Sequence, residues 1–399
     1  MKSYSAIIFC VLALFVRFDA SSASQLEQLP RPTGPFAIGT TTRQWIDTTR
    51  TEPFTGDPYD NRTLDVYIWY PAALHSGREP TPYVPYIDEA ERLVGVDYAN
   101  RVRAVRTNAT IEPAVSPQQD PFPLVVFSHG LGSSPAHYTT LAEELASQGF
   151  IVASINHSFG SAVTRQRRRD PQGLHARWRS GFAVTQAAEK FWADGITQWA
   201  GDIIFVINQL GDESGVATNF FGNRIDMSAV VVAGHSHGGA LAMFAAQLDE
   251  RIVAVVNLDG TARSIHAARP MPVPVLWMQQ DRSMMDSAQA AATLRATPRG
   301  FTEFMTYLDA NQDTVMSGAP AGSHLVVVQR AHHNHFSDLS LVFGEPEGLT
   351  GFIAPERALD IVRTYVVSFL AVQLGRANPG TLERLGRRFP EVAVSAGRK

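Results

Sequence analysis

From residue 124 onward, short apolar segments alternate with longer amphipathic ones. The apolar segments are rich in β-branched residues and predict strands at residues 124–127, 150–155, 229–233, 253–258, 273–278 and 325–328. Such runs are typical of parallel strands that are buried on both faces. The intervening segments predict helices at residues 136–147, 183–210, 238–248, 287–296 and about 354–374. This alternation predicts a doubly wound α/β sheet.

The segment before residue 124 follows a different pattern. Strands are expected at residues 36–42 and 64–70, where apolar and polar side chains alternate in the second run. Residues 76–123 are rich in proline and lack a regular period, so we expect an irregular excursion over the surface. The predicted organisation is one α/β domain at residues 24–399, with insertions at about 76–122 and 157–195.

The first residues have the features of a signal peptide. Lys2 precedes an apolar run at residues 6–16, and Ser21-Ser22-Ala23 supplies small residues for cleavage. We therefore predict a signal peptide at residues 1–23 and a secreted or periplasmic protein. The apolar run is shorter than the roughly 20 residues that cross a bilayer, and no other segment is long and apolar enough, so no transmembrane segment is expected.

Composition narrows the function classes. The 399 residues include 34 Lys and Arg against 38 Asp and Glu, a formal charge of −4, which argues against a nucleic-acid partner. The single cysteine, Cys10, lies in the predicted signal peptide, which excludes thiol catalysis and cysteine-bound zinc in the mature chain. Asn61, Asn108 and Asn156 each begin an Asn-x-Ser/Thr glycosylation pattern, which matters only in a eukaryotic host.

The most informative motif lies at the end of the predicted strand at residues 229–233. Gly234-His235-Ser236-His237-Gly238 fits Gly-x-Ser-x-Gly between a buried strand and a helix, the setting of a nucleophile elbow. The serine must sit on a tight, strained turn so that its hydroxyl projects above the sheet. Glycines on either side leave room for that turn. Ser236 is therefore the predicted nucleophile.

A serine nucleophile needs donors for the oxyanion of its intermediates. The strand at residues 124–127 runs into Ser128-His129-Gly130-Leu131-Gly132, where glycines allow a backbone amide to turn toward the site. In enzymes with this elbow, one donor follows the nucleophile and the other lies on such a loop. We therefore expect the amides of His237 and Leu131 to form the oxyanion hole, and His129 to brace the loop.

The base and the acid are expected further along the chain. His332, His333 and His335 follow the strand at residues 325–328. A metal site there is not expected, because no matching Cys or His pair stands elsewhere at zinc spacing and adjacent side chains diverge. Asp259 and Asp281 follow successive strands, and spacing alone does not choose between them as the acid.

These motifs together resemble the plasma-type platelet-activating factor acetylhydrolase family, along most of the mature chain. The resemblance includes residues 34–39, 66–71, 123–132 and 149–153, the serine elbow, and His333-Asn334-His335-Phe336-Ser337-Asp338. It implies an α/β-hydrolase fold, with a mostly parallel sheet flanked by helices, N-terminal strands and lid-like insertions. It also implies a cofactor-free esterase that removes short acyl groups from phospholipids without calcium.

The same resemblance assigns the remaining site residues. The family's acid stands in a Leu-Asp step 23 residues after the serine, which is Asp259, with Asp281 as the alternative. The family's histidine begins His-x-x-Phe-x-Asp, which is His333. The expected partner is a lipid or small-molecule ester.

The chain also departs from the family. His237 stands where the family often has an aromatic residue. The basic residues at 165–169, with Arg177 and Arg179 nearby, are either a solvated loop or a contact with lipid phosphates at a membrane surface. A general short-chain esterase, a cutinase-like polyester hydrolase and an inactive binding module remain alternatives.

Overall fold

The protein is described by a computed structural model that covers residues 26–55, 57–73, 80–117, 121–163, 185–212, 220–284, 297–345 and 351–396. Its centre is an 11-stranded sheet with the order β11-β10-β9-β8-β7-β5-β6-β2-β1-β4-β3. The strands are β1 (Ala37–Thr51), β2 (Asn61–Ala72), β3 (Pro80–Pro82), β4 (Arg106–Ile111), β5 (Phe122–Ser128), β6 (Ile151–Asn156), β7 (Ile225–His235), β8 (Ile252–Leu258), β9 (Val275–Gln280), β10 (His324–Val328) and β11 (Val392–Ala396).

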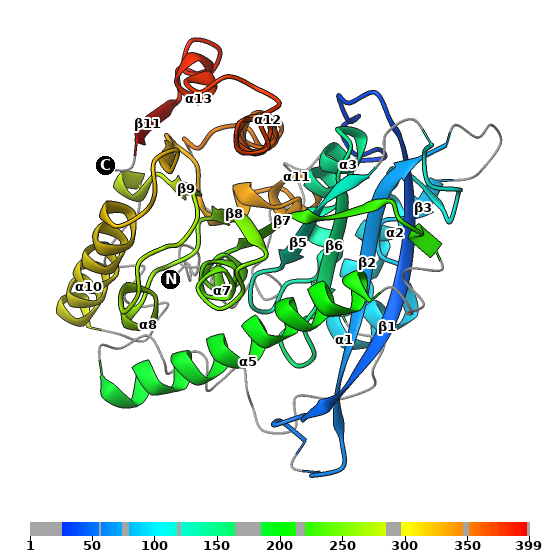
Figure 1. The fold of residues 1–399 in the computed structure, drawn as a ribbon, viewed down its shortest axis with the longest axis horizontal. Helices are drawn as coiled ribbons and strands as arrows, with labels where there is room; N and C mark the ends of the chain where they lie inside the picture. The colour runs from blue at the N-terminus through cyan, green and yellow to red at the C-terminus, as the bar shows by residue number, and fades with distance from the viewer. Residues whose placement is uncertain are drawn as a thin grey trace, which may run out of the picture.

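The helices lie between the strands and after them (Figure 1). They are α1 (Ile87–Val94), α2 (Val96–Arg103), α3 (Thr139–Ser147), α5 (Gln186–Gly211), α7 (His237–Ala246), α8 (Ser264–Ala267), α10 (Pro298–Ser317), α11 (Leu339–Phe343), α12 (Pro355–Gln373) and α13 (Thr381–Leu385). Short 3-10 helices are η1 (Pro135–Tyr138), η2 (Arg282–Met284) and η3 (His333–Phe336).

The middle of the sheet is parallel and its edges are mixed. Strand β5 pairs in parallel with β6 and β7, and the parallel ladder continues through β8, β9 and β10. Helical crossovers connect these strands, as parallel pairing requires. Antiparallel pairs add β2 and β1 beside β6, and β11 beside β10. This agrees with the doubly wound sheet that the alternation predicts and with the α/β-hydrolase fold that the family resemblance implies.

Every strand predicted from the apolar pattern is present, and the predicted helices within the described residues are present as α3 with η1, α5, α7 and α12. The expectation of an irregular segment at residues 76–123 is wrong, because β3, α1, α2 and β4 lie there. This segment contributes Tyr83, Ala90, Tyr98 and Val102 to a small hydrophobic core that it shares with residues of η1, α11 and α12. The prolines in this segment favour irregular structure, although several of them lie at or beside the ends of short helices and strands.

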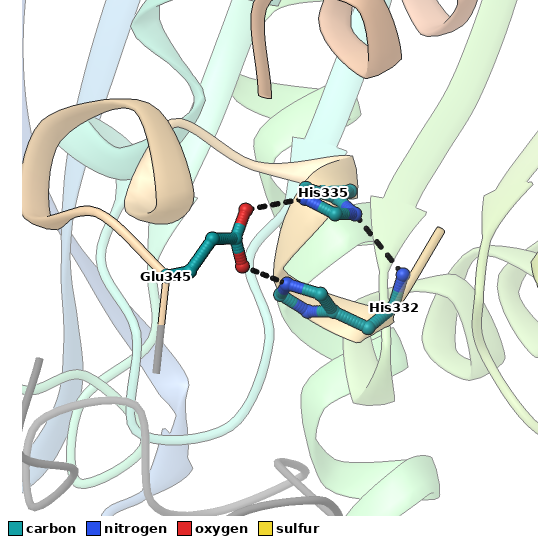
Figure 2. A group of neighbouring side chains, drawn as sticks. All are labelled: His332, His335 and Glu345. Atoms are coloured by element: carbon teal, nitrogen blue, oxygen red, sulfur yellow. Dashed lines mark hydrogen bonds and ion pairs between the residues drawn. The ribbon is translucent and has the colours of Figure 1, made fainter. Parts of the chain in front are cut away.

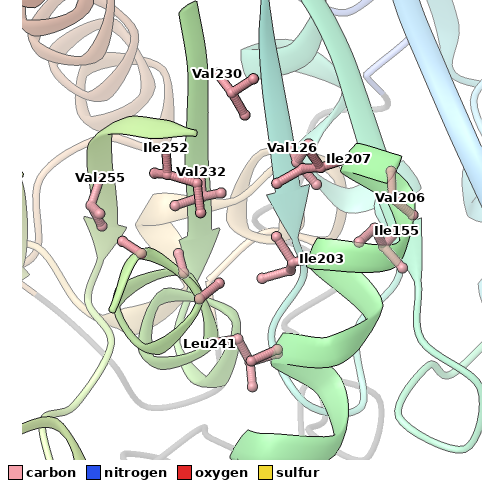
Figure 3. Packing of buried hydrophobic residues seen from close by; sticks show 14 of the residues in the cluster. Val126, Ile155, Ile203, Val206, Ile207, Val230, Val232, Leu241, Ile252 and Val255 are labelled. Carbon is pink, nitrogen blue, oxygen red and sulfur yellow. The ribbon is translucent and has the colours of Figure 1, made fainter. Parts of the chain in front are cut away.

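Two hydrophobic cores cover the two faces of the sheet. Helices α5 and α7 pack on one face and α3 and α12 on the other (Figure 1). On the first face, Ile203, Val206 and Ile207 of α5 lie against the strands (Figure 3). Their partners in the same cluster include Val126, Ile155, Val230, Val232, Leu241, Ile252 and Val255. The complete burial of such side chains fixes the positions of the strand ends.

Those strand ends position the predicted site. Parallel strands share one carboxyl edge, where ligands bind in open α/β sheets. Ser128 ends β5, His235 ends β7, Leu258 ends β8 and Val328 ends β10. The segments that carry Leu131, Ser236, Asp259 and His333 therefore leave the sheet along the same edge.

Some predictions fall outside the described residues. These are the signal peptide, the basic segment at residues 165–169 with Arg177 and Arg179, and the helix at residues 287–296. Among the described helices, none is long and apolar enough to cross a membrane. Of the glycosylation motifs, Asn156 is buried and its Nδ2 donates to the Val163 carbonyl at 2.9 Å, so this asparagine is inaccessible in the folded chain.

Candidate active site

Ser236 occupies a strained turn between β7 and α7. Its backbone has φ 57° and ψ −123°, a conformation that costs energy for a residue with a side chain. The Ser236 amide donates to the Leu258 carbonyl at 2.8 Å, which ties the turn to the end of β8. Strain of this kind in a strand–turn–helix setting is the geometry of a nucleophile elbow.

The surrounding glycines are required by close backbone contacts. A Cβ on Gly234 would lie 2.2 Å from the Gly238 carbonyl oxygen, and a Cβ on Gly238 would lie 2.0 Å from that of Ser128. Both distances are far shorter than real carbon–oxygen contacts, so the turn excludes any side chain at either position. The Gly-x-Ser-x-Gly spacing therefore follows from close packing within the turn, at Gly234, and against the end of β5, at Gly238.

Asn257 is a contributor that the sequence analysis missed. It is fully buried at the end of β8, where its Oδ1 accepts from the Gly260 amide at 2.7 Å. A Cβ on Gly239 would lie 2.2 Å from the same oxygen, so Asn257 sits where α7 approaches the sheet. One signal was available, because a lone amide interrupts an apolar strand directly before Leu258 and Asp259.

Asp259 and His333 form a buried pair. Oδ2 of Asp259 lies 2.5 Å from Nδ1 of His333, and Oδ1 accepts from the Gln280 amide at 2.9 Å. Both side chains are at most 6% exposed. An aspartate on Nδ1 fixes the imidazole tautomer and leaves Nε2 to exchange protons, the arrangement needed in a general base.

Asp281, the alternative acid, has other partners. Its Oδ2 accepts from the Arg330 amide at 2.9 Å, and its Oδ1 accepts from the hydroxyl of Ser283 at 2.6 Å. Burial opposes its charge, but these hydrogen bonds lower the pKa of Asp281 below its ordinary value. The structure therefore brings Asp259, and not Asp281, to His333.

The segment after β5 lies beside Ser236. A Cβ on Gly130 would stand 3.2 Å from Cβ of Ser236, and the neighbouring Leu131 is buried. The Gly132 amide donates to the Gly160 carbonyl at 2.7 Å, which anchors the turn. His129 braces this loop, since its Nδ1 lies 2.8 Å from the Gly130 carbonyl and its Nε2 accepts from the His157 amide at 3.3 Å.

His237 begins α7 directly after the nucleophile and is enclosed by aromatic rings. Its ring centroid lies 5.2 Å from that of Trp192 and 5.0 Å from that of Trp199, both in edge-to-face geometry. Burial, with His157 and Arg263 nearby, holds the pKa of His237 well below its ordinary value. A neutral imidazole therefore stands at the position after the predicted nucleophile, where the acetylhydrolase family that the sequence resembles often has an aromatic residue.

The side chains of His332 and His335 converge on Glu345 (Figure 2). The expectation that the histidines of this segment diverge is therefore wrong for these two. His335 Nε2 lies 2.7 Å from Glu345 Oε1, and His332 Nε2 contacts Oε2 of the same carboxylate. The Nδ1 atoms accept backbone N–H groups, from Asn334 at 3.3 Å for His332 and from His332 at 3.1 Å for His335.

Those backbone donors decide the chemistry of the cluster. A neutral imidazole that accepts a hydrogen bond at Nδ1 carries its proton on Nε2. A metal bound at Nε2 would require the opposite, an Nδ1–H aimed at an acceptor. Glu345 thus holds His332 and His335, which flank His333 in the chain. The direction of the hydrogen bonds at their Nδ1 atoms does not suit a metal ion at Nε2.

A second Asp–His–Ser arrangement is formed by Asp202 of α5, His157 after β6 and Ser128 at the end of β5. His157 Nδ1 is 2.8 Å from Asp202 Oδ2, and His157 Nε2 is 3.1 Å from Ser128 Oγ. Asp202 also pairs with Arg62 at 2.6 Å and with Arg50 at 3.0 Å. The Asp202, His157 and Arg62 side chains have no exposed surface. No local sequence pattern indicates this cluster, because its members come from distant segments.

A cavity of about 240 Å³ lies over β1, β2 and β4, with Tyr67, Trp69 and Tyr83 among the lining side chains. Its lining contains neither the predicted triad residues nor Leu131 or His237. This cavity is therefore separate from the predicted site.

Comparison with protein families gives two matches. Residues 21–191 match the family described as platelet-activating factor acetylhydrolase, isoform II. Residues 125–396 match the alpha/beta hydrolase family. The second match spans the segments that carry Leu131, Ser236, Asp259 and His333.

Individual proteins give the same picture at low identity. The chain is 25% identical over 395 residues to platelet-activating factor acetylhydrolase of Gallus gallus, covering 87% of this chain and 84% of the relative. It is 23% identical over 417 residues to a probable 1-alkyl-2-acetylglycerophosphocholine esterase of Arthroderma benhamiae, with 96% and 97% coverage. A solved ferulic acid esterase from Streptomyces cinnamoneus superposes with a TM-score of 0.72 at 26% identity, covering 93% of this chain and 99% of the esterase.

Proposed function

This chain belongs to the alpha/beta hydrolase family and is a carboxylic ester hydrolase, and we propose that Ser236, His333 and Asp259 are its catalytic triad. The observation that carries the proposal is the 2.5 Å contact of Asp259 with His333, together with the strained turn at Ser236. The residue types, their chain order and their shared sheet edge support the same assignment.

In the proposed mechanism, Ser236 Oγ attacks the acyl carbon of the ester while His333 Nε2 takes the hydroxyl proton. Asp259 holds His333 at Nδ1 and stabilises the imidazolium that forms. The tetrahedral intermediate collapses to an acyl-enzyme, and the alcohol leaves with the proton from His333. Water then attacks the acyl-enzyme by the same steps, and the free acid and the Ser236 hydroxyl are regenerated.

The negative charge on the intermediate needs fixed donors. We assign this role to the backbone amides of Leu131 and His237. The position of Gly130 beside Ser236 and of His237 as the first residue of α7 supports the assignment. Preorganised donors of this kind stabilise the transition state without reorganisation during the reaction. Because the triad generates its own nucleophile, calcium should not be required.

For the substrate, we propose a phospholipid with a short acyl chain, cleaved outside the cytoplasm after removal of residues 1–23. Support comes from the platelet-activating factor acetylhydrolases of other organisms, which resemble this chain along most of its length. A general short-chain esterase is the second candidate, favoured by the ferulic acid esterase fold match. Contact of the basic segment at residues 165–169 with lipid phosphates belongs to the first candidate.

Hydrolysis of two substrate series separates these candidates. Phospholipids with graded second acyl chains and p-nitrophenyl esters of the same chain lengths should be assayed in EDTA. The proposal expects cleavage of both series, with phospholipid turnover falling as the chain lengthens. Robust p-nitrophenyl ester hydrolysis without cleavage of any short-acyl phospholipid would leave the general esterase standing.

A further inference from the structure

One tyrosine hydroxyl joins three segments of the proposed site. Oη of Tyr138 accepts from the Gly130 amide at 3.0 Å and lies 2.8 Å from His235 Nδ1. On the other side of the same imidazole, His235 Nε2 lies 3.0 Å from the carbonyl oxygen of His333. Tyr138, His235 and His333 are all buried.

The protons in this chain of hydrogen bonds have a single consistent arrangement. The His333 carbonyl can only accept, so His235 must carry its proton on Nε2. Burial, with His333 nearby, holds the pKa of His235 well below its ordinary value, so its Nδ1 is an acceptor. The Tyr138 hydroxyl therefore donates to His235 and accepts from Gly130. Each hydrogen bond therefore has one possible donor, and the order of donors cannot reverse.

These hydrogen bonds connect three parts of the proposed site. Gly130 precedes Leu131, whose amide is a proposed oxyanion donor. His235 precedes Ser236, and the His333 carbonyl belongs to the proposed base itself. The Tyr138 ring is held in place, since its centroid lies 4.8 Å from that of Phe127 in β5. A fixed phenol thus sets the distance between the oxyanion loop and the nucleophile elbow.

We propose that Tyr138 is a positioning residue that aligns the oxyanion loop, the nucleophile and the base through His235. This inference rests on the proposed triad. A displacement of about 1 Å in a reacting group can cost about 100-fold in rate. Loss of the hydroxyl frees both the Gly130 amide and His235 Nδ1, so the alignment should fail while the fold remains.

The test is Tyr138→Phe, with Tyr70→Phe as its matched control. Tyr70 is equally buried, and its hydroxyl donates to the Pro113 carbonyl at 2.7 Å, remote from the site. Both variants lose one buried hydroxyl and should show similar decreases in thermal midpoint. On a soluble p-nitrophenyl ester, Tyr138→Phe should lose about 10- to 100-fold in kcat with KM changed less than about threefold. Tyr70→Phe should keep the wild-type kcat.

Two results would overturn the proposal. In the first, both variants keep a kcat within about twofold of wild type; in the second, both lose kcat by a similar factor. If Tyr138→Phe does not fold, His235→Leu carries the same test, because leucine can neither accept from Tyr138 nor donate to the His333 carbonyl and so interrupts the same chain of hydrogen bonds. Ser236→Ala, assayed beside them, tests the triad separately, since its activity does not depend on how Tyr138 acts.

Discussion

Two aspartate–histidine pairs lie at the same edge of the sheet, and their surroundings differ. Asp259 contacts His333 at 2.5 Å, and Asp202 contacts His157 at 2.8 Å. Asp259 takes a second hydrogen bond from a neutral backbone amide, whereas Asp202 is shared with Arg62 and Arg50. Ser236 stands on a strained turn, while Ser128, beside His157, belongs to the regular ladder of β5.

The difference explains why one pair suits catalysis and the other suits support. A catalytic imidazole must gain a proton during the reaction, which a carboxylate that is not shared with an arginine among the described residues favours. Burial lowers the pKa of His157, and Arg62 and Arg50 lower it further against the pull of Asp202. His157 therefore stays neutral and holds Ser128 at the base of the oxyanion loop. We propose that the same residue types differ in function through charge balance and backbone strain.

The largest expected effect separates the two serines. Ser236→Ala should lower kcat by about 10⁶, as loss of a triad serine does. Ser128→Ala should stay within about tenfold, since one hydrogen bond is worth roughly 1 kcal/mol. Purified variants with wild-type circular dichroism should be assayed on p-nitrophenyl acetate. Residual Ser236→Ala activity above a few per cent would remove Ser236 from its role.

The next contrast concerns the acids. Asp259→Asn should lower kcat by about 10⁴ because the wrong tautomer of His333 is then favoured. Asp281→Asn, the matched variant after the neighbouring strand, should keep nearly all activity, since the contacts described for the Asp281 carboxylate are with Ser283 in η2 and with the Arg330 amide. The steady-state kcat of both variants decides the matter. The opposite ranking would make Asp281 the acid.

Asp202→Asn should lower the stability of the fold and leave kcat largely unchanged, unlike the variants of the proposed triad. It leaves Arg62 buried beside an uncharged amide, with Glu52 at 2.7 Å as its remaining carboxylate partner. The cost should therefore be at most about 3–5 kcal/mol, the cost of a fully broken buried pair. The free energy of unfolding in urea should fall by up to that amount, while kcat per folded molecule stays within about tenfold. A large loss of kcat at unchanged stability would place Asp202 in catalysis.

The smallest effect is a change in the pH dependence of stability. The pKa of His157 lies below the ordinary 6.5 because it is buried, so below pH 6.5 the unfolded chain binds a proton first and stability falls. His157→Gln should flatten this fall by up to about 1.4 kcal/mol per pH unit.

Asp338 should change the pH dependence of stability in the opposite direction to His157. Burial raises the pKa of Asp338 to about 7, so the folded chain binds its proton first and gains stability as pH falls through 7. Asp338→Asn should therefore steepen the acid-side fall that His157→Gln flattens. Urea unfolding between pH 4 and 8 measures both slopes, and equal slopes in all three proteins would contradict the assigned shifts.

The central sheet was predictable from sequence because buried parallel strands are short apolar runs with clear ends. The small core around α1 and α2 was not, because these helices have only eight residues each and lie in a proline-rich segment. Helix α10 was missed for a related reason, since its apolar residues are sparse among threonines and acids.

At the site, local motifs predicted Ser236 and the oxyanion loop, while His333 and Asp259 needed the family resemblance. Tyr138, His157 and Asp202 act through contacts between distant segments, which no local pattern records. The convergence of His332 and His335 on Glu345 escaped prediction because it depends on the turn of η3 and on the path of the chain after α11.

The central claim is that Ser236, and not Ser128, is the reactive serine. Labelling with a fluorophosphonate, followed by peptide mass spectrometry, tests it directly, because such reagents form a stable bond only with an activated serine. The account expects one adduct per chain on Ser236, slower labelling in Asp259→Asn and none in Ser236→Ala. An adduct on Ser128, or an active enzyme that takes no label, would contradict it.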